Sequence, residues 1–151
     1  MVTFPASQRC ASNCEWQTDR RNWYLQFQYE EPHIQRLGCY VLTHSAAENP
    51  YEININGSFS RQPDFPVSAK VAFKGNLVVK AYAGDKEFSG EYNLVYVDKD
   101  IAIDQFCYLG QEMSQIFTTE KKPSAELLER IWKIVDEHPE VEKSLFKEVI
   151  C

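Results

Sequence analysis

Apolar and polar residues alternate along most of the chain between Trp23 and residue 119. Successive side chains of a strand point to opposite faces, so a period of two predicts a sheet with one face buried. In the first stretch, Trp23, Leu25 and Phe27 occupy every second position. The same pattern recurs, and we expect strands at residues 23–28, 38–44, 51–56, 68–74, 77–83, 91–97, 100–107 and 112–119.

Turn signals separate these strands. Gly75-Asn76 and Gly84-Asp85 indicate hairpins, and residues 97–100 form a tight Val-Asp-Lys-Asp turn. The stretch with Pro63 and Pro66 is expected to be a loop. Short strands that follow one another at this spacing predict an up-and-down barrel or a sandwich.

After Pro123 the pattern changes to the period of a helix. Ser124 is a suitable N-cap, and His138-Pro139 ends the pattern. The apolar stripe of this helix consists of Leu127, Leu128, Ile131, Ile134 and Val135. A lone helix after so many strands must bury its stripe on the outside of the sheet. The strand beneath it should then be apolar on both faces, as the run Ile101-Ala102-Ile103 is. Residues 140–149 are expected to form a weaker helical or extended tail.

Composition narrows the class of protein. A length of 151 residues fits one domain, residues 1–151, and 44% hydrophobic residues exclude a disordered chain. The net charge is −6 and no run of Lys or Arg exceeds two residues, so nucleic acid is not an expected partner. No apolar run approaches the roughly 20 residues of a membrane-spanning helix, so no membrane span is expected.

The cysteines favour an oxidising compartment. Five cysteines and three histidines show no zinc-ligand spacing, so we expect no metal site. A disulfide at Cys151 would hold a chain end that otherwise frays. The first residues are too few and too polar for a signal peptide, so either a signal was removed or the protein never had one. The cysteines favour the first alternative, and we expect a secreted protein. Asn56-Gly57-Ser58 also matches a glycosylation sequon.

Four features together resemble the lipocalin family, in the branch with insecticyanin, bilin-binding protein, crustacyanin and apolipoprotein D. Asn22-Trp23-Tyr24 is similar to the family's Gly-x-Trp-Tyr, with Arg21 at the place of the Gly. The stretch of residues 92–107 is similar to the hairpin of that branch, and residues 123–130 to the start of its C-terminal helix. Four cysteines follow the order of that branch's disulfide cysteines: Cys10, Cys39, Cys107 and Cys151.

The resemblance implies an all-β fold, an eight-stranded up-and-down antiparallel β-barrel with one C-terminal α-helix packed outside. It also implies that Cys39 pairs with Cys151 and that Cys107 pairs with Cys10 or Cys14, with Cys10 preferred. In function it implies a secreted carrier of one small hydrophobic ligand, for example a pigment such as a bilin or carotenoid.

For the residues that could have a catalytic or haem-binding role, a structural role is the better explanation. The family counterpart of Trp23 plugs the closed end of the barrel, so we expect Trp23 to be structural. His33 and His44 could ligate a haem iron, but His33 lies in a polar segment typical of a solvated loop. An unpaired Cys14 or Cys10 could be a nucleophile only on a strand inside the barrel, and neither lies on an expected strand. We therefore expect that the protein is not an enzyme, and the sequence identifies no cofactor. The fifth cysteine, left without a partner in the chain, could form an intermolecular disulfide, so a homodimer stays an alternative.

Tyrosines and apolar residues on the expected strands are the candidate ligand contacts. An interior of aromatic carbons with a few hydroxyl groups suits a flat or elongated apolar ligand with polar ends. The candidates are Phe27, Tyr29, Tyr40, Leu42, Ile53, Ile55, Val71, Phe73, Tyr82, Tyr92, Tyr96 and Phe117. Alternatively the rings fill a collapsed barrel, and the protein is an interaction or inhibitor protein of the salivary type that acts through its loops. Alternation alone does not say which face of a strand points inward.

Overall fold

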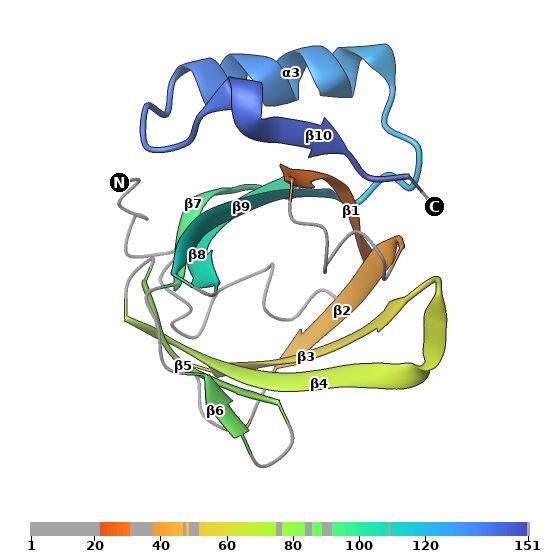
Figure 1. Cartoon of the computed structure of the whole chain (residues 1–151), viewed down its shortest axis with the longest axis vertical. Coiled ribbons are helices and arrows are strands. Elements are labelled where there is room, and N and C mark those ends of the chain that lie inside the picture. The colour runs from red at the N-terminus through yellow and green to blue at the C-terminus, as the bar shows by residue number, and fades with distance from the viewer. Residues whose placement is uncertain are drawn as a thin grey trace.

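The computed structural model describes residues 22–30, 38–46, 48, 52–74, 77–83, 86–88, 92–108 and 110–150, with the side chains of 46, 52–53, 62–67, 69–74, 77–83, 86–88, 92 and 108 left out. Within these ranges the chain forms a strongly curved antiparallel sheet with one α-helix outside it (Figure 1). The elements are β1 (Asn22–Tyr29), β2 (Tyr40–Ala46), β3 (Glu52–Phe59), β4 (Gln62–Lys74), β5 (Leu77–Ala83), β6 (Lys86–Phe88), β7 (Tyr92–Val97), β8 (Ile101–Tyr108), β9 (Gln111–Thr118), α3 (Ala125–Asp136), the short 3-10 helix η2 (Lys143–Leu145) and β10 (Phe146–Glu148).

The strand pairings follow a ring. Neighbours in the sheet run β1-β2-β3-β4-β5-β7-β8-β9, and β9 pairs back with β1. The shortest pairing in the ring is that between β5 and β7, which consists of the register pairs Leu77–Asn93 and Val78–Tyr92. Each of these eight strands overlaps an expected one, and the predicted fold class is confirmed. Two short strands were not predicted: β6 pairs with β5, and β10 pairs with β1.

The expected loop at Pro63 and Pro66 is wrong, because both residues belong to β4. The register between β3 and β4 shifts here: Gly57 pairs with Val67, whereas Phe59 pairs with Gln62. Residues 63–66 therefore bulge out of the ladder. Proline has no N–H to donate, and a bulge is one of the places where a sheet accepts it. The two prolines thus mark an irregular strand.

Helix α3 begins and ends where its sequence predicts. Ser124 is in the extended conformation, and its Oγ accepts a hydrogen bond from the backbone N–H of Leu127 at 3.2 Å. This bond satisfies one of the N–H groups that the first turn leaves free. Residues 140–149 were expected to be either helical or extended, and the last part of this tail is extended. It forms β10, which lies along β1 with Tyr29 opposite Phe146.

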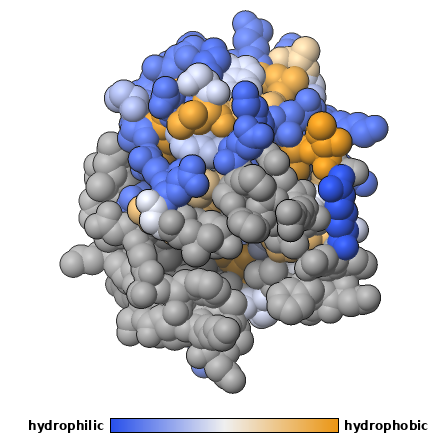
Figure 2. Space-filling model, viewed as in Figure 1, coloured by the Kyte–Doolittle hydropathy of each residue, from blue (hydrophilic) through white to orange (hydrophobic). Residues whose placement is uncertain are grey.

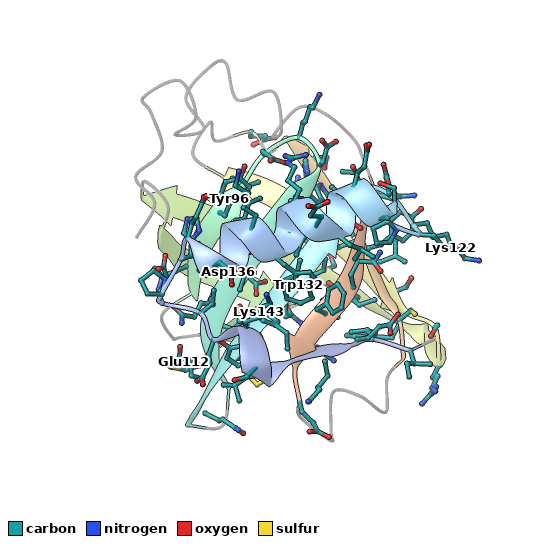
Figure 3. The ribbon with its side chains drawn as sticks, turned by 90° about the horizontal axis from the view of Figure 1, so that it is seen from above. Tyr96, Glu112, Lys122, Trp132, Asp136 and Lys143 are labelled. Atoms are coloured by element: carbon teal, nitrogen blue, oxygen red, sulfur yellow. The ribbon has the colours of Figure 1, made fainter. Side chains whose placement is uncertain are left out.

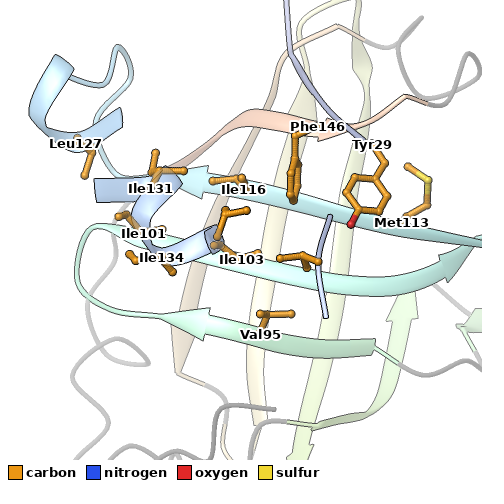
Figure 4. Packing of buried hydrophobic residues seen from close by; sticks show 12 residues of the cluster. Tyr29, Val95, Ile101, Ile103, Met113, Ile116, Leu127, Ile131, Ile134 and Phe146 are labelled. Carbon is orange, nitrogen blue, oxygen red and sulfur yellow. The ribbon is translucent and has the colours of Figure 1, made fainter. Parts of the chain in front are cut away.

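The larger of two apolar clusters among the described residues lies between α3 and the outer face of the sheet (Figure 4). From α3 it takes Leu127, Ile131, Ile134 and Val135; from the strands below, Tyr29, Val95, Ile101, Ile103 and Ile116; and from the tail, Val141 and Phe146. Apolar surface removed from water stabilises this contact by roughly 25 cal/mol per Å². The expected outer docking of the helix is confirmed, and Ile101 and Ile103 lie beneath it.

A polar cluster joins α3 to the turn between β7 and β8. The Oδ1 atom of Asp98 accepts hydrogen bonds from the backbone N–H groups of Asp100 and Ile101, at 2.7 and 2.8 Å. Its Oδ2 atom accepts from the hydroxyl of Tyr96 at 2.7 Å and is paired with the guanidinium of Arg130. Arg130 also pairs with Asp100 at 3.1 Å. One carboxylate therefore shapes the turn and fixes the helix above it.

The surface over α3 and the tail is mainly hydrophilic, with small apolar areas (Figure 2). Among the described residues, Leu145 and Ile150 are the large hydrophobic side chains that are exposed. Beneath the helix, Trp132 packs edge-on against Phe27 with ring centroids 4.8 Å apart. The Nζ atom of Lys143 lies 5.7 Å from the centre of the Trp132 ring (Figure 3). None of the described helices is long and apolar enough to cross a membrane.

Ile131→Asp is expected to lower the free energy of unfolding by roughly 3 kcal/mol or more, because it buries an unpaired charge. Ile131 is completely buried at the centre of the helix stripe. Chemical denaturation measures the change, with Glu129→Asp on the exposed face of the same helix as the control. Equal stability of the two variants would mean that α3 is not docked.

Candidate ligand-binding site

The predicted ligand contacts divide between the two faces of the sheet. Tyr40, Leu42 and Phe117 belong to a second buried cluster, on the face opposite to α3 and therefore inside the barrel. Ile55 lies directly opposite the buried His44 in the pairing of β2 with β3. The side chains of Ile53, Val71, Phe73, Tyr82 and Tyr92 lie outside the described residues, and their contacts stay predictions.

Three of the predicted contacts lie on the outside of the barrel, which corrects their assignment to the interior. Phe27 packs against Trp132 of α3. Tyr29 packs against Phe146, and its hydroxyl accepts a hydrogen bond from the backbone N–H of Glu142 at 2.7 Å. Tyr96 also packs against the outer core, where its hydroxyl binds Asp98.

A β-bulge in β1 is the reason for part of this error. The register of β1 with β9 shifts between Leu25 and Phe27. Leu25 therefore points into the barrel and Phe27 out of it, although strict alternation would place both on one face. A bulge of this kind leaves no mark in the apolar pattern. For Tyr96, alternation left both faces open, and docking of α3 decided between them.

The inner cluster centres on Trp23, Leu25 and Phe117, all at least 95% buried. Trp23 lies beside His44, with ring centroids 5.9 Å apart. The indole N–H of Trp23 is buried and has no hydrogen-bond partner in the described part of the chain. The position of Trp23 agrees with its expected packing role. His44 is buried in β2, whereas His33 lies outside the described residues.

Tyr40 extends across the inner face of β3. Its ring stacks on Phe59 with centroids 4.5 Å apart and meets Phe117 edge-on at 6.1 Å. A Cβ atom at Gly57 would lie 2.4 Å from the Tyr40 ring, so only glycine leaves room for it. Tyr40, Phe59 and Phe117 thus form a continuous aromatic surface, which we call the aromatic wall.

A row of polar side chains crosses the inner face next to this wall. Asp104, Gln115 and Gln28 lie opposite one another on β8, β9 and β1. Each stands at an inward position: Ala102 and Phe117, two residues away, belong to the inner cluster, and Phe27 next to Gln28 points outward. Asp104 and Gln28 are each 2% exposed. We call Gln28, Asp104 and Gln115 the polar row.

The polar row is held by its own hydrogen bonds. The Oδ1 atom of Asp104 accepts from the backbone N–H of Gln115 at 2.9 Å. The Nε2 atom of Gln115 donates to the Oε1 atom of Gln28 at 3.4 Å. Such bonds reduce the cost of burying polar groups in an apolar interior.

The polar row was missed in the sequence, although one signal for it was present. In the run from Ile101 to Asp104, the helix stripe requires that Ile101 and Ile103 face outward. Alternation then points Ala102 and Asp104 inward, which places a carboxylate inside the barrel. The search for aromatic lining residues passed over this position.

Burial, and in second place the negative charge of Asp104, raise the pKa of Tyr40 to about 12. The phenol is therefore neutral at physiological pH. Because the pKa in the folded state exceeds the unfolded value, the resulting stabilisation is complete below about pH 10 and is lost as the pH rises through 12.

In an alkaline titration followed by tyrosinate absorbance, Tyr40 is expected to ionise well after the tyrosines with ordinary pKa values. Tyr40→Phe should remove this late step and reduce the loss of stability above pH 10. Asp104→Asn should move the step to lower pH, because it removes the nearby negative charge. An unchanged late step in Tyr40→Phe would show that another tyrosine carries it.

The cysteines agree with the expected disulfides only in part. Cys39 is disulfide-bonded, and its partner lies outside the described residues, so the pairing with Cys151 stays a prediction. Cys107 is a free, exposed cysteine at the end of β8. The predicted bridge from Cys107 to Cys10 or Cys14 is therefore wrong. Cys107 is exposed because it lies at the end of β8. The prediction failed because the order of the cysteines along the chain does not fix the distances between them, and a disulfide requires two cysteines close together.

Cys107 is expected to react with iodoacetamide in the native, unreduced protein, because its thiol is exposed and unpaired. Peptide mass mapping should find the label on Cys107 and none on Cys39. Cys107→Ser should abolish labelling of that peptide and leave the thermal midpoint nearly unchanged. A disulfide-linked peptide that contains Cys107 would contradict the structure.

No group of three or more His, Cys, Asp or Glu side chains in the described ranges is arranged to hold a metal ion. No family model matches the sequence, and no curated protein matches it.

Solved structures do share this fold. Insecticyanin from the tobacco hornworm Manduca sexta matches with a TM-score of 0.68 at 10% identity, over 87% of this chain and 78% of that one. Apocrustacyanin A1 from lobster matches with a TM-score of 0.65 at 11% identity, over 87% and 76%. The amine-binding protein of Rhodnius prolixus, in its tryptamine complex, matches with a TM-score of 0.65 at 9% identity, over 89% and 79%. These proteins are lipocalins, so the chain has the lipocalin fold that its sequence resembles.

Proposed function

We propose that this chain, with its lipocalin fold, is a secreted carrier that binds one small, mainly hydrophobic molecule inside the barrel. No catalytic step is part of this proposal. A pigment such as a bilin or carotenoid is one form that the ligand could take. The proposal rests above all on the inner face of the barrel, where the aromatic wall lies beside the polar row.

These two features suit ligand binding because they supply different parts of recognition. Aromatic side chains contribute large apolar contact area, and a few fixed polar groups orient the ligand. The rings of Tyr40 and Phe59 are held nearly parallel, with an angle of 19° between their planes. A flat ligand could continue such a stack. The similar structure of an amine-binding protein with tryptamine supports a small-molecule ligand for this fold.

Secretion is supported by the disulfide at Cys39, since disulfides persist mainly in oxidising compartments. The exposed thiol of Cys107 adds no support for a framework of two bridges. A homodimer stays a prediction.

Titration with Nile red, an uncharged apolar fluorophore, tests the carrier function. The unmodified protein is expected to bind it saturably with one-to-one stoichiometry. Ile55→Trp should raise the Kd about tenfold or more, because the larger side chain removes space inside the barrel next to His44. Overpacking should cost about 1–3 kcal/mol of stability if the interior is already filled.

Ser144→Trp is the matched control, because it adds the same ring at an exposed position of η2. It should leave both the Kd and the thermal midpoint unchanged. Absence of saturable binding to the unmodified protein would overturn the carrier function and favour action through the loops.

A further inference from the structure

We propose that Asn56 carries an N-linked glycan on the outer face of the barrel, on the side away from α3. This inference goes beyond ligand binding and rests only on the secretion that is part of the proposed function. Asn56-Gly57-Ser58 is the one Asn-x-Ser/Thr triplet in the sequence. Because such triplets also arise by chance, the position of this one in the fold has to carry the inference.

The two residues that glycosylation needs lie on the exposed face of β3. Residues directly opposite each other in a sheet share a face. Gly57 lies opposite Leu42, which belongs to the inner cluster, so Gly57 faces inward. Asn56 and Ser58 stand one position before and after it and therefore face outward, and both are exposed. This strand thus presents the acceptor amide and the hydroxyl group on one surface.

Packing inside the barrel accounts for the middle residue of the triplet. A Cβ atom at Gly57 would lie 2.4 Å from the ring of Tyr40, so the aromatic wall requires a glycine there. Asn56 and Ser58 lie on the exposed face, where substitutions usually change stability by only about 0.5 kcal/mol or less. Stability therefore requires the glycine and not the two polar residues beside it, which are the two that a glycan needs.

Helix α3 does not cover this part of the outer face. The cluster under α3 takes its strand residues from β1, β7, β8 and β9, and Figure 1 shows β3 and β4 on the other side of the barrel. The outward positions around Asn56 hold short polar side chains: Thr43 opposite it on β2, Ser68 opposite it on β4, and Asn22 beyond Thr43 on β1. Short side chains leave space for a sugar, and their hydroxyl and amide groups can form hydrogen bonds with it.

One hydrogen bond orients the acceptor amide. The hydroxyl of Ser68 donates to the Oδ1 atom of Asn56 at 3.3 Å. A glycan is attached to the Nδ2 atom, at the other end of the same amide. The linked side chain keeps its carbonyl oxygen as an acceptor. The contact with Ser68 is therefore compatible with the modified as well as with the unmodified asparagine.

The modification is a group transfer from an oligosaccharide that is carried on a lipid diphosphate. The Nδ2 atom of Asn56 forms a bond to the anomeric carbon of the first sugar, and the bond from that carbon to the diphosphate oxygen breaks. The lipid diphosphate leaves with the electron pair of the broken bond, and Nδ2 loses one proton to a base of the transferase. The transferase recognises the hydroxyl of Ser58, which is not consumed. Because the transfer takes place in the secretory compartment, the inference depends on secretion.

Mass analysis of the secreted protein tests this modification. The full chain is produced in insect cells behind a cleavable secretion signal and is recovered from the medium and from the secretory membranes. We expect most molecules to carry additional mass in steps of hexose units. Treatment with peptide-N-glycosidase F in heavy-oxygen water should remove this mass and leave an aspartate labelled with the heavy oxygen at position 56.

Substitutions within and beside the triplet locate the glycan. Asn56→Gln and Ser58→Ala should each lose the added mass, whereas Ser58→Thr keeps a hydroxyl group and should retain it. Ser68→Ala is the matched control, because it removes the same hydroxyl group from the neighbouring strand on the same exposed face. It should leave the added mass unchanged. Nile red should bind Asn56→Gln as tightly as the unmodified protein, because Asn56 faces away from the interior.

The outcomes separate this inference from the carrier function. An unmodified Asn56 in chains recovered from the secretory membranes overturns the inference. Added mass that persists in Ser58→Ala, or that is lost in Ser68→Ala, overturns it as well, because the triplet then does not determine the modification. These masses are measured on denatured protein and do not depend on whether a variant folds. A glycosylated protein that fails to bind Nile red overturns the carrier function alone, whereas binding by a protein without the glycan overturns the glycan alone.

Discussion

Burial of β8 and β9 on both faces is the constraint on which the rest of this structure depends. On the outer side, Ile103 and Ile116 lie opposite each other beneath α3, and on the inner side Ala102 lies opposite Phe117. A shift of one residue in the pairing would exchange the two sets, and neither face could accept the other's side chains. The docked helix therefore fixes the register of the sheet, and the register fixes which side chains the barrel encloses.

Because the middle of these strands has no face in water, the polar groups there depend on partners within the protein. The hydroxyl of Ser114 donates to the backbone oxygen of Asp104 at 2.5 Å, and the side chain of Gln105 donates to the backbone oxygen of Glu140 at 2.6 Å. Both are outer-face contacts that stabilise the tail or the strand pair. Inside, Asp104, Gln115 and Gln28 are joined by hydrogen bonds to one another.

Some aromatic residues that their character alone would assign to the cavity lie instead on the outside of the barrel. Phe27, Tyr29 and Tyr96 pack against α3 or the tail that follows it, and two of them direct their hydroxyl groups to fixed partners there. Aromatic side chains suit a helix–sheet interface as well as a ligand site, because a large buried apolar area stabilises both. Among the described residues, the interior is consequently less aromatic and more polar than the tyrosine content predicts.

The sequence by itself determined the eight barrel strands, the capped helix with its apolar stripe and the turn at Asp98, because periodicity and capping are local properties of the chain. It also contained the inward position of Asp104, once Ile101 and Ile103 were assigned to the helix. The tertiary structure alone decided the bulge that turns Phe27 outward, the strand that incorporates Pro63 and Pro66, and the free thiol of Cys107. Each of these depends on how far apart two distant segments lie or on how their registers meet, and a local pattern of apolar residues carries no measure of either.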